Sequence, residues 1–283
     1  MTKTLTMLVI TWVIATATTF AAADNTKLSD ILAVQSDETQ ARYQYRNPEE
    51  TLDFFGIESG MTVVEALPGK VWYTGILLPY LGSEGKVIGA DYAVDTWTGI
   101  GYDSPDFLET RKNWPAGWIS DNEERMENDW ANVDAFVFGA LPTSMHGTAD
   151  AVLFFRALHN MNYTAPDAGH LKEAIRNAWD VLKPSGVVGI IQHEARDNMS
   201  DAWSNGANGY LKRDYVVDLM VAAGFELVAE SDMNANDKDQ PKESDSVWRL
   251  PPSYDGAQND PEKMAAVKAI GESNRMTLKF IKP

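Results

Sequence analysis

Two side chains that could carry proton-transfer chemistry follow predicted strands of this 283-residue chain. His159 comes shortly after the apolar run 151–155, and His193 directly follows the apolar run 187–192. A neutral imidazole near pH 7 can accept a proton or bind a metal. We therefore predict His159 and His193 as candidate catalytic residues that face one cleft. The alternative is that each imidazole only orders its own loop by hydrogen bonding.

A third candidate catalytic residue is Arg156, at the end of the same apolar run as His159. A guanidinium at that place could bind a carboxylate of the substrate, or it could support the cleft through an ion pair. The residue types leave both interpretations open. The remaining histidines, His146 and His170, follow no predicted strand and are expected at the surface.

Two acidic residues stand where a sheet commonly binds its ligand. Glu65 lies near the end of the apolar run 61–67, which Pro68-Gly69 terminates, and Asp91 ends the run 86–91. In an open parallel sheet, ligands bind beyond the carboxyl ends of the strands. Asp91 is therefore placed to accept hydrogen bonds from the hydroxyl groups of a ribose.

Other chemistries find little support in the sequence. His159 and His193 could form a metal site with Glu194, but no pair of histidines four residues apart and no HExxH motif accompanies them, so we predict no metal. There is no GxSxG elbow and no GxxxxGK[ST] phosphate loop. The chain has no cysteine, which excludes disulfides, zinc–thiolate sites and cysteine nucleophiles.

The elements that position these residues alternate between strand and helix. Short apolar runs predict strands at 61–67, 86–91, 135–139, 151–155, 187–192, 225–229 and 276–281. Amphipathic spacing and cap residues predict helices at 47–55, 72–81, from 104 onwards, 167–182 and 211–223. This alternation favours a doubly wound, Rossmann-like α/β sheet with helices on both faces.

The N-terminal segment has the features of a secretory signal. Residues 1–23 combine Lys3, an apolar stretch at 8–14 and a small-residue run that ends in Ala21-Ala22-Ala23. We predict cleavage after Ala23 and a periplasmic or secreted protein. A retained anchor is the alternative.

Beyond this signal, residues 24–283 are predicted to form a single domain. Between the last two predicted strands lies a long segment, 231–274, which is either a lid over the site or an excursion on the surface.

The net charge of the chain indicates which kinds of partner it can bind. Lysines and arginines number 24 against 41 aspartates and glutamates, which gives a formal net charge of −17. Loss of the leader would remove one lysine and change this to 23 − 41 = −18. Such a field repels nucleic acids and anionic lipid surfaces. We therefore expect a small-molecule substrate, no nucleic acid and no stable membrane association after cleavage.

Several stretches in order along the chain resemble class I S-adenosylmethionine-dependent methyltransferases, and among these the exported proteins called predicted methyltransferases. The matching residues are Tyr45-Arg46-Asn47-Pro48, 60–65 with Pro68-Gly69, Phe155-Arg156 with His159-Asn160, 182–186, Ala223-Gly224-Phe225, 247–252, 270–273 and 275–279. They extend from about residue 42 to the C-terminus.

The resemblance implies a seven-stranded sheet with its last strand antiparallel, and a cofactor cleft at the ends of the first, second and fourth strands. It implies that Glu65 and Gly69 mark the glycine-rich loop and that Asp91 holds the ribose of S-adenosylmethionine. It also implies that Tyr45 and Arg46 form a flap over this cofactor.

The chain departs from the family pattern in the loop after Glu65. Lys70 and Val71 stand where further glycines are expected, and a valine there can crowd the cofactor. The acid that commonly follows the third strand is replaced by Gly139-Ala140-Leu141-Pro142.

Two hypotheses follow: an exported S-adenosylmethionine-dependent methyltransferase acting on a small molecule, or a non-catalytic small-molecule binding protein on a decayed methyltransferase scaffold. A metal-assisted enzyme that uses the two histidines is a weaker third.

Overall fold

The structure, a computed structural model, describes residues 26–164 and 169–283. The predicted leader, residues 1–23, lies outside these ranges. The described residues contain one seven-stranded sheet in the order β3-β2-β1-β4-β5-β7-β6. Its strands are β1 Thr62–Ala66, β2 Lys86–Asp91, β3 Asn132–Val137, β4 Ala149–Phe155, β5 Leu182–His193, β6 Glu226–Ser231 and β7 Arg275–Ile281.

The direction of the strands confirms the predicted fold class. Strands β1 to β5 pair in parallel, whereas β7 is antiparallel to both β5 and β6. The chain winds outward from β1 to β3 and then returns to β4, on the other side of β1. The resulting switch point between β1 and β4 is where a doubly wound sheet opens a crevice for a ligand.

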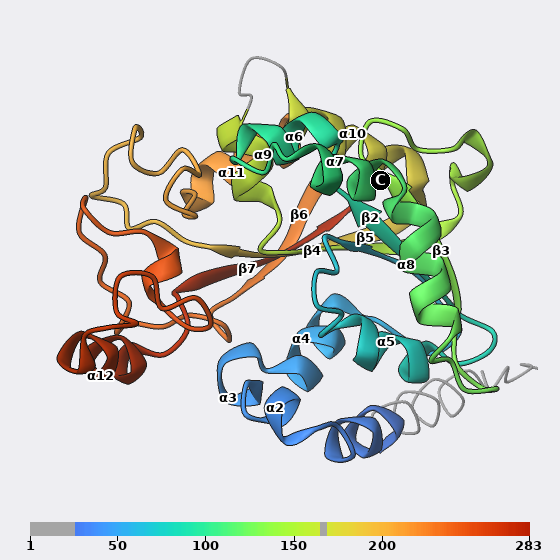
Figure 1. The fold of residues 1–283 in the computed structure, drawn as a ribbon. Helices are drawn as coiled ribbons and strands as arrows, with labels where there is room; N and C mark the ends of the chain where they lie inside the picture. Colours follow the sequence, from blue (N-terminus) through green and yellow to red (C-terminus); the bar gives the residue numbers. More distant parts are fainter. Residues whose placement is uncertain (1–25, 165–168) are drawn as a thin grey trace, which may run out of the picture.

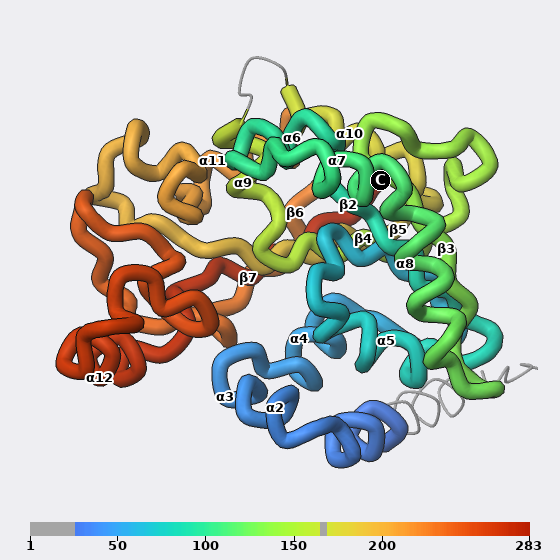
Figure 2. Tube along the Cα trace, viewed as in Figure 1, coloured from blue at the N-terminus to red at the C-terminus, as the bar shows by residue number. Residues whose placement is uncertain are grey.

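Helices cover both faces of the sheet, as Figures 1 and 2 show for α4 and α5 on one face and α10 and α11 on the other. Their bounds are α2 Asp37–Gln40, α3 Tyr43–Arg46, α4 Pro48–Phe55, α5 Thr74–Leu81, α6 Val94–Gly99, α7 Pro105–Lys112, α8 Trp114–Glu123, α9 Leu158–Thr164, α10 His170–Val181, α11 Arg213–Ala222 and α12 Pro261–Ile270. Residues 26–33 are also helical.

The alternating side chains of the strands divide the core into two apolar layers. Val64 and Phe154 face α10 and α11, whereas Val63 and Leu153 face α4 and α5. Because every central strand is covered on both faces, its sequence reads as a continuous apolar run, which is the signal that predicted these strands.

Predicted and observed elements differ at several places. The third strand, predicted at 135–139, begins at Asn132, because the polar residues Asn132 and Asp134 also pair with β2. Asn47 was expected to cap α4, but its side chain makes no cap hydrogen bond and instead donates to the Met233 carbonyl over 2.6 Å. The sequence analysis did not predict the helix at 26–33 or helices α2, α3, α6, α8, α9 and α12.

The segment between β6 and β7 is fixed to the rest of the protein by a buried carboxylate. Asp239 is 2% exposed and accepts hydrogen bonds from the Arg249 guanidinium at 2.5 Å and the Tyr210 hydroxyl at 2.8 Å. It also accepts one from the backbone N–H of Asn274 at 2.9 Å. A small apolar cluster under α12 contains Leu250 and Val267. These contacts hold part of the segment against residues that follow β5.

We predict that Asp239→Ala lowers the free energy of unfolding by about 3 kcal/mol, because it removes the buried carboxylate of the Arg249 guanidinium and leaves only the longer, 3.8 Å contact with Asp245. Urea denaturation measures this change. The matched control is Asp201→Ala, which removes the exposed ion pair with Lys212 and should cost less than about 1 kcal/mol. Equal effects of the two substitutions would contradict the anchoring role of Asp239.

Candidate functional site

The loop after β1 lies at the switch point of the sheet. Glu65 pairs in register with Leu153 of β4 and is 3% exposed. Its carboxylate accepts a 2.6 Å hydrogen bond from the Thr74 hydroxyl at the start of α5. Burial raises the pKa of Glu65 to about 7, although the hydrogen bond from Thr74 and the nearby charge of Arg156 favour its ionised form. The carboxyl group is therefore an internal support of this loop.

Three alternate residues of the same loop adopt the left-handed backbone conformation. The φ angles are +52° at Leu67, +56° at Gly69 and +58° at Val71. Glycine adopts this region without strain, whereas a β-branched side chain does not. Val71 thus occupies a conformation suited to glycine, which is the departure noted in the sequence. Lys70 is exposed and makes no hydrogen bond or ion pair with the described residues.

Asp91 ends β2 at the neighbouring position and is already hydrogen-bonded. It is 1% exposed, and its Oδ2 accepts from Trp97 Nε1 and Arg111 Nη1, each at 3.3 Å. Burial raises the pKa of Asp91 to about 6, against the opposing effects of the Tyr92 backbone and Arg111. Arg111 comes from α7, where nothing in the sequence indicates a role at the site. The predicted ribose carboxylate is therefore satisfied from within the protein.

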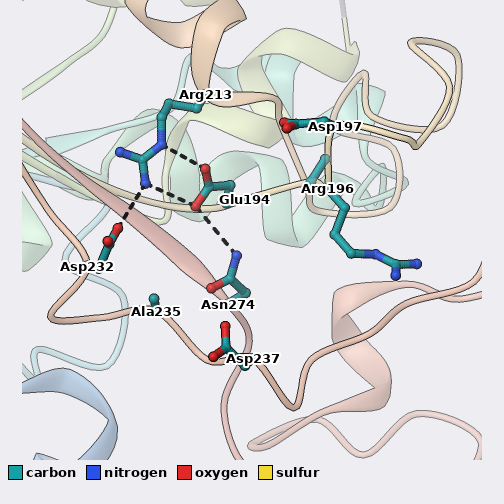
Figure 3. A pocket seen from close by; sticks show the side chains of 9 residues that line it. Glu194, Arg196, Asp197, Arg213, Asp232, Ala235, Asp237 and Asn274 are labelled. Carbon is teal, nitrogen blue, oxygen red and sulfur yellow. Dashed lines mark hydrogen bonds and ion pairs between the residues drawn. The ribbon is translucent and has the colours of Figure 1, made fainter.

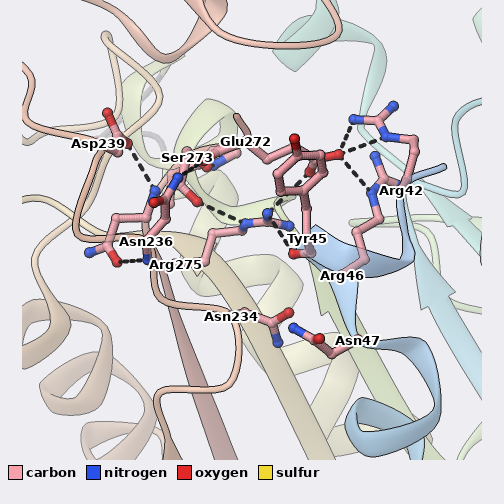
Figure 4. A network of polar contacts seen from close by, with 12 residues as sticks. Arg42, Tyr45, Arg46, Asn47, Asn234, Asn236, Asp239, Glu272, Ser273 and Arg275 are labelled. Atoms are coloured by element: carbon pink, nitrogen blue, oxygen red, sulfur yellow. Dashed lines mark hydrogen bonds and ion pairs between the residues drawn. The ribbon is translucent and has the colours of Figure 1, made fainter. Parts of the chain in front are cut away.

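The predicted flap, Tyr45 and Arg46, packs against the end of the long segment between β6 and β7 (Figure 4). Arg46 is 5% exposed, lies 4.5 Å over the Trp72 ring and forms a 3.3 Å ion pair with Glu272. The Tyr45 ring lies against Gly271, where an added Cβ would come within 2.6 Å of it. These residues share one buried polar network.

Glu272 is the centre of this network, and the sequence analysis assigned it no role. It forms ion pairs with the guanidinium groups of Arg42, Arg46 and Arg275. Burial alone would raise the pKa of Glu272, but Arg275 and Arg46 outweigh burial and hold it at about 2. The polar run before the last predicted strand, 270–275, was the available signal for this residue.

The two candidate histidines lie close together. The ring centroids of His159 and His193 are 5.4 Å apart. A 2.6 Å hydrogen bond joins His193 Nδ1 to the hydroxyl of Ser273, and the Gln192 amide lies 3.3 Å from His159 Nδ1. Burial lowers the pKa of both imidazoles, that of His159 to about 4. Both rings are therefore neutral near pH 7.

Arg156 takes a left-handed conformation directly after β4, with φ at +59°. Its backbone N–H donates to the Ile191 carbonyl of β5 over 2.6 Å. Its charge acts on the ionisation of Glu65 and Glu272 and on that of both imidazoles. Within the described residues no carboxylate forms an ion pair with the Arg156 guanidinium, so the ion pair that the sequence allowed is not present.

A hollow of about 630 Å³ lies beyond the end of β5, where the residues that follow β5 and β6 meet those before β7, and it is lined by charged residues (Figure 3). Glu194 lines it and forms an ion pair with Arg213 over 2.8 Å. The carboxylate that was considered as a metal ligand with the two imidazoles is therefore paired with a guanidinium. Within 26–164 and 169–283, no group of three or more His, Asp or Glu side chains is arranged to hold a metal.

The remaining histidines differ from each other. His146 is exposed, as expected. His170 is not a surface residue: only 14% of its side chain is exposed, and its ring lies 3.0 Å from both Asp95 and Thr96. It lines a cavity of about 240 Å³ that also contacts Gly139, beyond the ends of β2 and β3.

We predict that Glu65→Gln removes part of the pH dependence of stability. Because the pKa of Glu65 rises from 4.5 to about 7 on folding, the folded protein binds the extra proton, and this contribution is lost as pH rises from about 4.5 through 7. Relative to Glu65→Gln, the wild type should lose about 3 kcal/mol of unfolding free energy between pH 4.5 and 8. Urea denaturation at both pH values measures it, and parallel pH profiles would contradict it.

Among known proteins, this chain is similar only in fold, to the solved structures named below. No protein-family model matches the sequence, and no curated protein does. A methyltransferase from Aquifex aeolicus described as SAM-dependent is similar at 15% identity and a TM-score of 0.48, over 90% of this chain and 98% of that one. A putative methyltransferase of Haloferax volcanii, in complex with the activator Trm112, is similar at 14% identity and a TM-score of 0.48, over 92% and 97%. Geranyl diphosphate C-methyltransferase from Streptomyces coelicolor gives 13% identity and a TM-score of 0.48, over 84% and 77%.

Proposed function

We propose that this protein is an S-adenosylmethionine-dependent methyltransferase that acts on a small molecule. The observation that carries the proposal is the switch point between β1 and β4, where the Glu65 loop, Asp91 and the two imidazoles meet the carboxyl ends of neighbouring strands. A doubly wound sheet binds nucleotide-like ligands at such a crevice. The seven strands and the antiparallel β7 are those implied by the sequence resemblance.

The side chains at the crevice have donor and acceptor chemistry that fits this cofactor. Asp91 acts as a hydrogen-bond acceptor, which a ribose diol requires, and Gly69 gives a left-handed turn without a side chain. A cavity of about 240 Å³ beside Gly139 and His170 lies beyond the ends of β2 and β3, next to Asp91 in the sheet. When bound, the cofactor supplies an electrophilic methyl group. The protein's own contribution is then to position the acceptor and exclude water.

The neutral imidazoles give the site hydrogen-bond acceptors. His193 is oriented by Ser273, and His159 by the Gln192 amide. Because both rings are uncharged near pH 7, a ring nitrogen can accept a hydrogen bond from the hydroxyl or amine of a methyl acceptor. Burial and the charge of Arg156 oppose protonation of both rings, which also makes them weak bases, so we assign them to positioning the acceptor.

Two observations favour the second candidate, a non-catalytic binding protein on a decayed scaffold. Arg111 and Trp97 already donate hydrogen bonds to the Asp91 carboxylate, and Val71 adopts a left-handed backbone conformation that suits glycine. Both features oppose cofactor binding. The two candidates therefore differ in one measurable property, the affinity for S-adenosylhomocysteine, and the third, a metal-assisted enzyme, differs from both in metal content.

We expect calorimetry to detect S-adenosylhomocysteine binding to the wild type, and Asp91→Asn to weaken it at least tenfold by removing the charged acceptor of the ribose hydroxyls. Arg111→Gln should tighten binding, because the cofactor no longer competes with a guanidinium for Asp91. The matched control is Lys112→Gln, a neighbouring exposed residue of α7 that pairs only with Glu109.

Absence of binding at millimolar S-adenosylhomocysteine would contradict the methyltransferase proposal. If Val71→Gly then restored binding, the decayed scaffold would be the correct description. Unchanged affinity in Asp91→Asn would show that the cofactor lies elsewhere. Elemental analysis of the purified protein tests the metal-assisted alternative separately.

We also propose that the protein is exported to the periplasm or the medium, on the strength of the charge, apolar stretch and small-residue run in residues 1–23. None of the helices in the described ranges is long and apolar enough to cross a bilayer. Mass spectrometry of the protein recovered from cells should give an N-terminus at Asp24. A chain that retains Met1 or Lys3 would contradict cleavage.

A further inference from the structure

A cavity that the proposed methyl transfer does not use lies between α9 and α11, which are neighbours in Figure 1. Its volume is about 380 Å³. Small-molecule pockets in proteins commonly measure about 300 to 1,000 Å³. The cavity is therefore large enough for a compact ligand. Its lining consists of residues of the two helices and of the loop that precedes α11, namely Asn162, Tyr163, Asp201, Ser204, Asn205, Lys212 and Tyr215.

Two tyrosine rings at this cavity are left half-exposed. Tyr163 of α9 is 45% exposed and Tyr215 of α11 is 41% exposed. Tyr102 is also exposed, but its ring stacks on that of Phe107. Among the residues that the structure describes, no aromatic ring pairs with Tyr163 or Tyr215. Both rings at the cavity are therefore available to a ligand.

The polar groups of the walls are already bonded to one another. The Tyr215 hydroxyl donates a hydrogen bond to Asn162 Oδ1, and the Asn162 amide donates to the Asn205 carbonyl over 2.8 Å. The Ser204 hydroxyl donates to the Ser200 carbonyl over 2.8 Å. A ligand therefore meets satisfied polar groups and unpaired ring surface, which favours apolar contact over a hydrogen-bonded fit.

The two charged groups at the cavity are paired with each other. Lys212 Nζ forms a 2.6 Å ion pair with Asp201. Only 28% of the Lys212 side chain is exposed, so its aliphatic stem contributes apolar surface to the wall. An ionic ligand would have to displace one member of this pair, whereas an uncharged ligand would not.

Backbone contacts fix the loop that forms one wall. An added Cβ at Gly206 would lie 2.2 Å from the His159 carbonyl oxygen, so the loop approaches α9 as closely as only glycine allows. At the other end of the loop, the Leu211 N–H donates to the His193 carbonyl over 3.0 Å. The cavity is therefore formed before any ligand binds.

We propose that this cavity binds an uncharged small molecule that contains an aromatic ring, with the rings of Tyr163 and Tyr215 as its partners. Aromatic rings attract one another in offset-stacked and edge-to-face arrangements, beyond the effect of the area that they bury. The proposal does not rest on the proposed methyl transfer, because neither Glu65, Asp91 nor the two imidazole rings line this cavity.

The test uses indole as the probe and the protein as recovered from cells. We expect indole to raise the Tm of the wild type in a saturable manner, and calorimetry to give its dissociation constant. Tyr163→Ala should weaken indole binding about tenfold, because it removes one of the two rings. The matched control is Tyr163→Phe, which keeps the ring and should bind indole as the wild type does.

Equal affinity of the wild type and Tyr163→Ala for indole would overturn the proposal, as would a wild type that does not bind indole. Cyclohexanol is uncharged but has no aromatic ring, and stabilisation by it equal to that by indole would overturn the assignment to an aromatic ligand. If Tyr163→Ala does not fold, the same comparison is made between Tyr215→Leu and Tyr215→Phe, of which only the second should retain the affinity of the wild type.

S-adenosylhomocysteine separates this site from the crevice. We expect the affinity for indole to be the same with and without it. Displacement of indole by S-adenosylhomocysteine would place indole in the crevice and overturn the proposal. A protein that binds indole through Tyr163 but does not bind S-adenosylhomocysteine would retain this site and lose only the proposed methyl transfer.

Discussion

The arrangement of the crevice depends on the buried carboxylate of Glu272. Three guanidinium groups converge on it, from Arg42, from Arg46 of α3 and from Arg275 at the start of β7. Arg42 and Arg46 lie 230 and 226 positions from Glu272 along the chain, whereas Arg275 is its near neighbour in sequence. Because a buried carboxylate is tolerated only with such partners, the N-terminal helices and the end of the β6–β7 segment must meet at this point.

Three carboxyl groups of the crevice show how position decides their ionisation. Burial without a cation in contact raises the pKa of Glu65, and burial raises that of Asp91 despite Arg111. Glu272 is also buried, but three arginines hold its pKa low. The same chemical group therefore serves as a support at β1 that gains a proton just below neutral pH, an acceptor at β2 and a permanent anion before β7.

The interaction of Asp91 with Arg111 and Trp97 has two physical consequences. It satisfies a carboxylate that would otherwise be buried without enough partners, and it ties the helical segment between β2 and β3 to the crevice. A ligand that uses Asp91 must offer donors that replace these. The affinity of such a ligand is then reduced by the free energy needed to displace the internal partners.

The sequence by itself determined the sheet. Central strands buried on both faces are apolar throughout, so Val63, Val64 and their counterparts marked these strands, and the strand ends suggested that Glu65, Asp91 and His193 lie at one edge of the sheet. The sequence could not reveal which charges pair, because Glu272 meets Arg42 and Arg46 only when segments far apart in the chain are folded together. Pairing depends on distances of a few ångströms, which residue types and spacing do not encode. Tertiary structure therefore decided that Asp91 is held by Arg111, that Glu194 turns to Arg213, and that Arg156 has no partner of its own among the described residues.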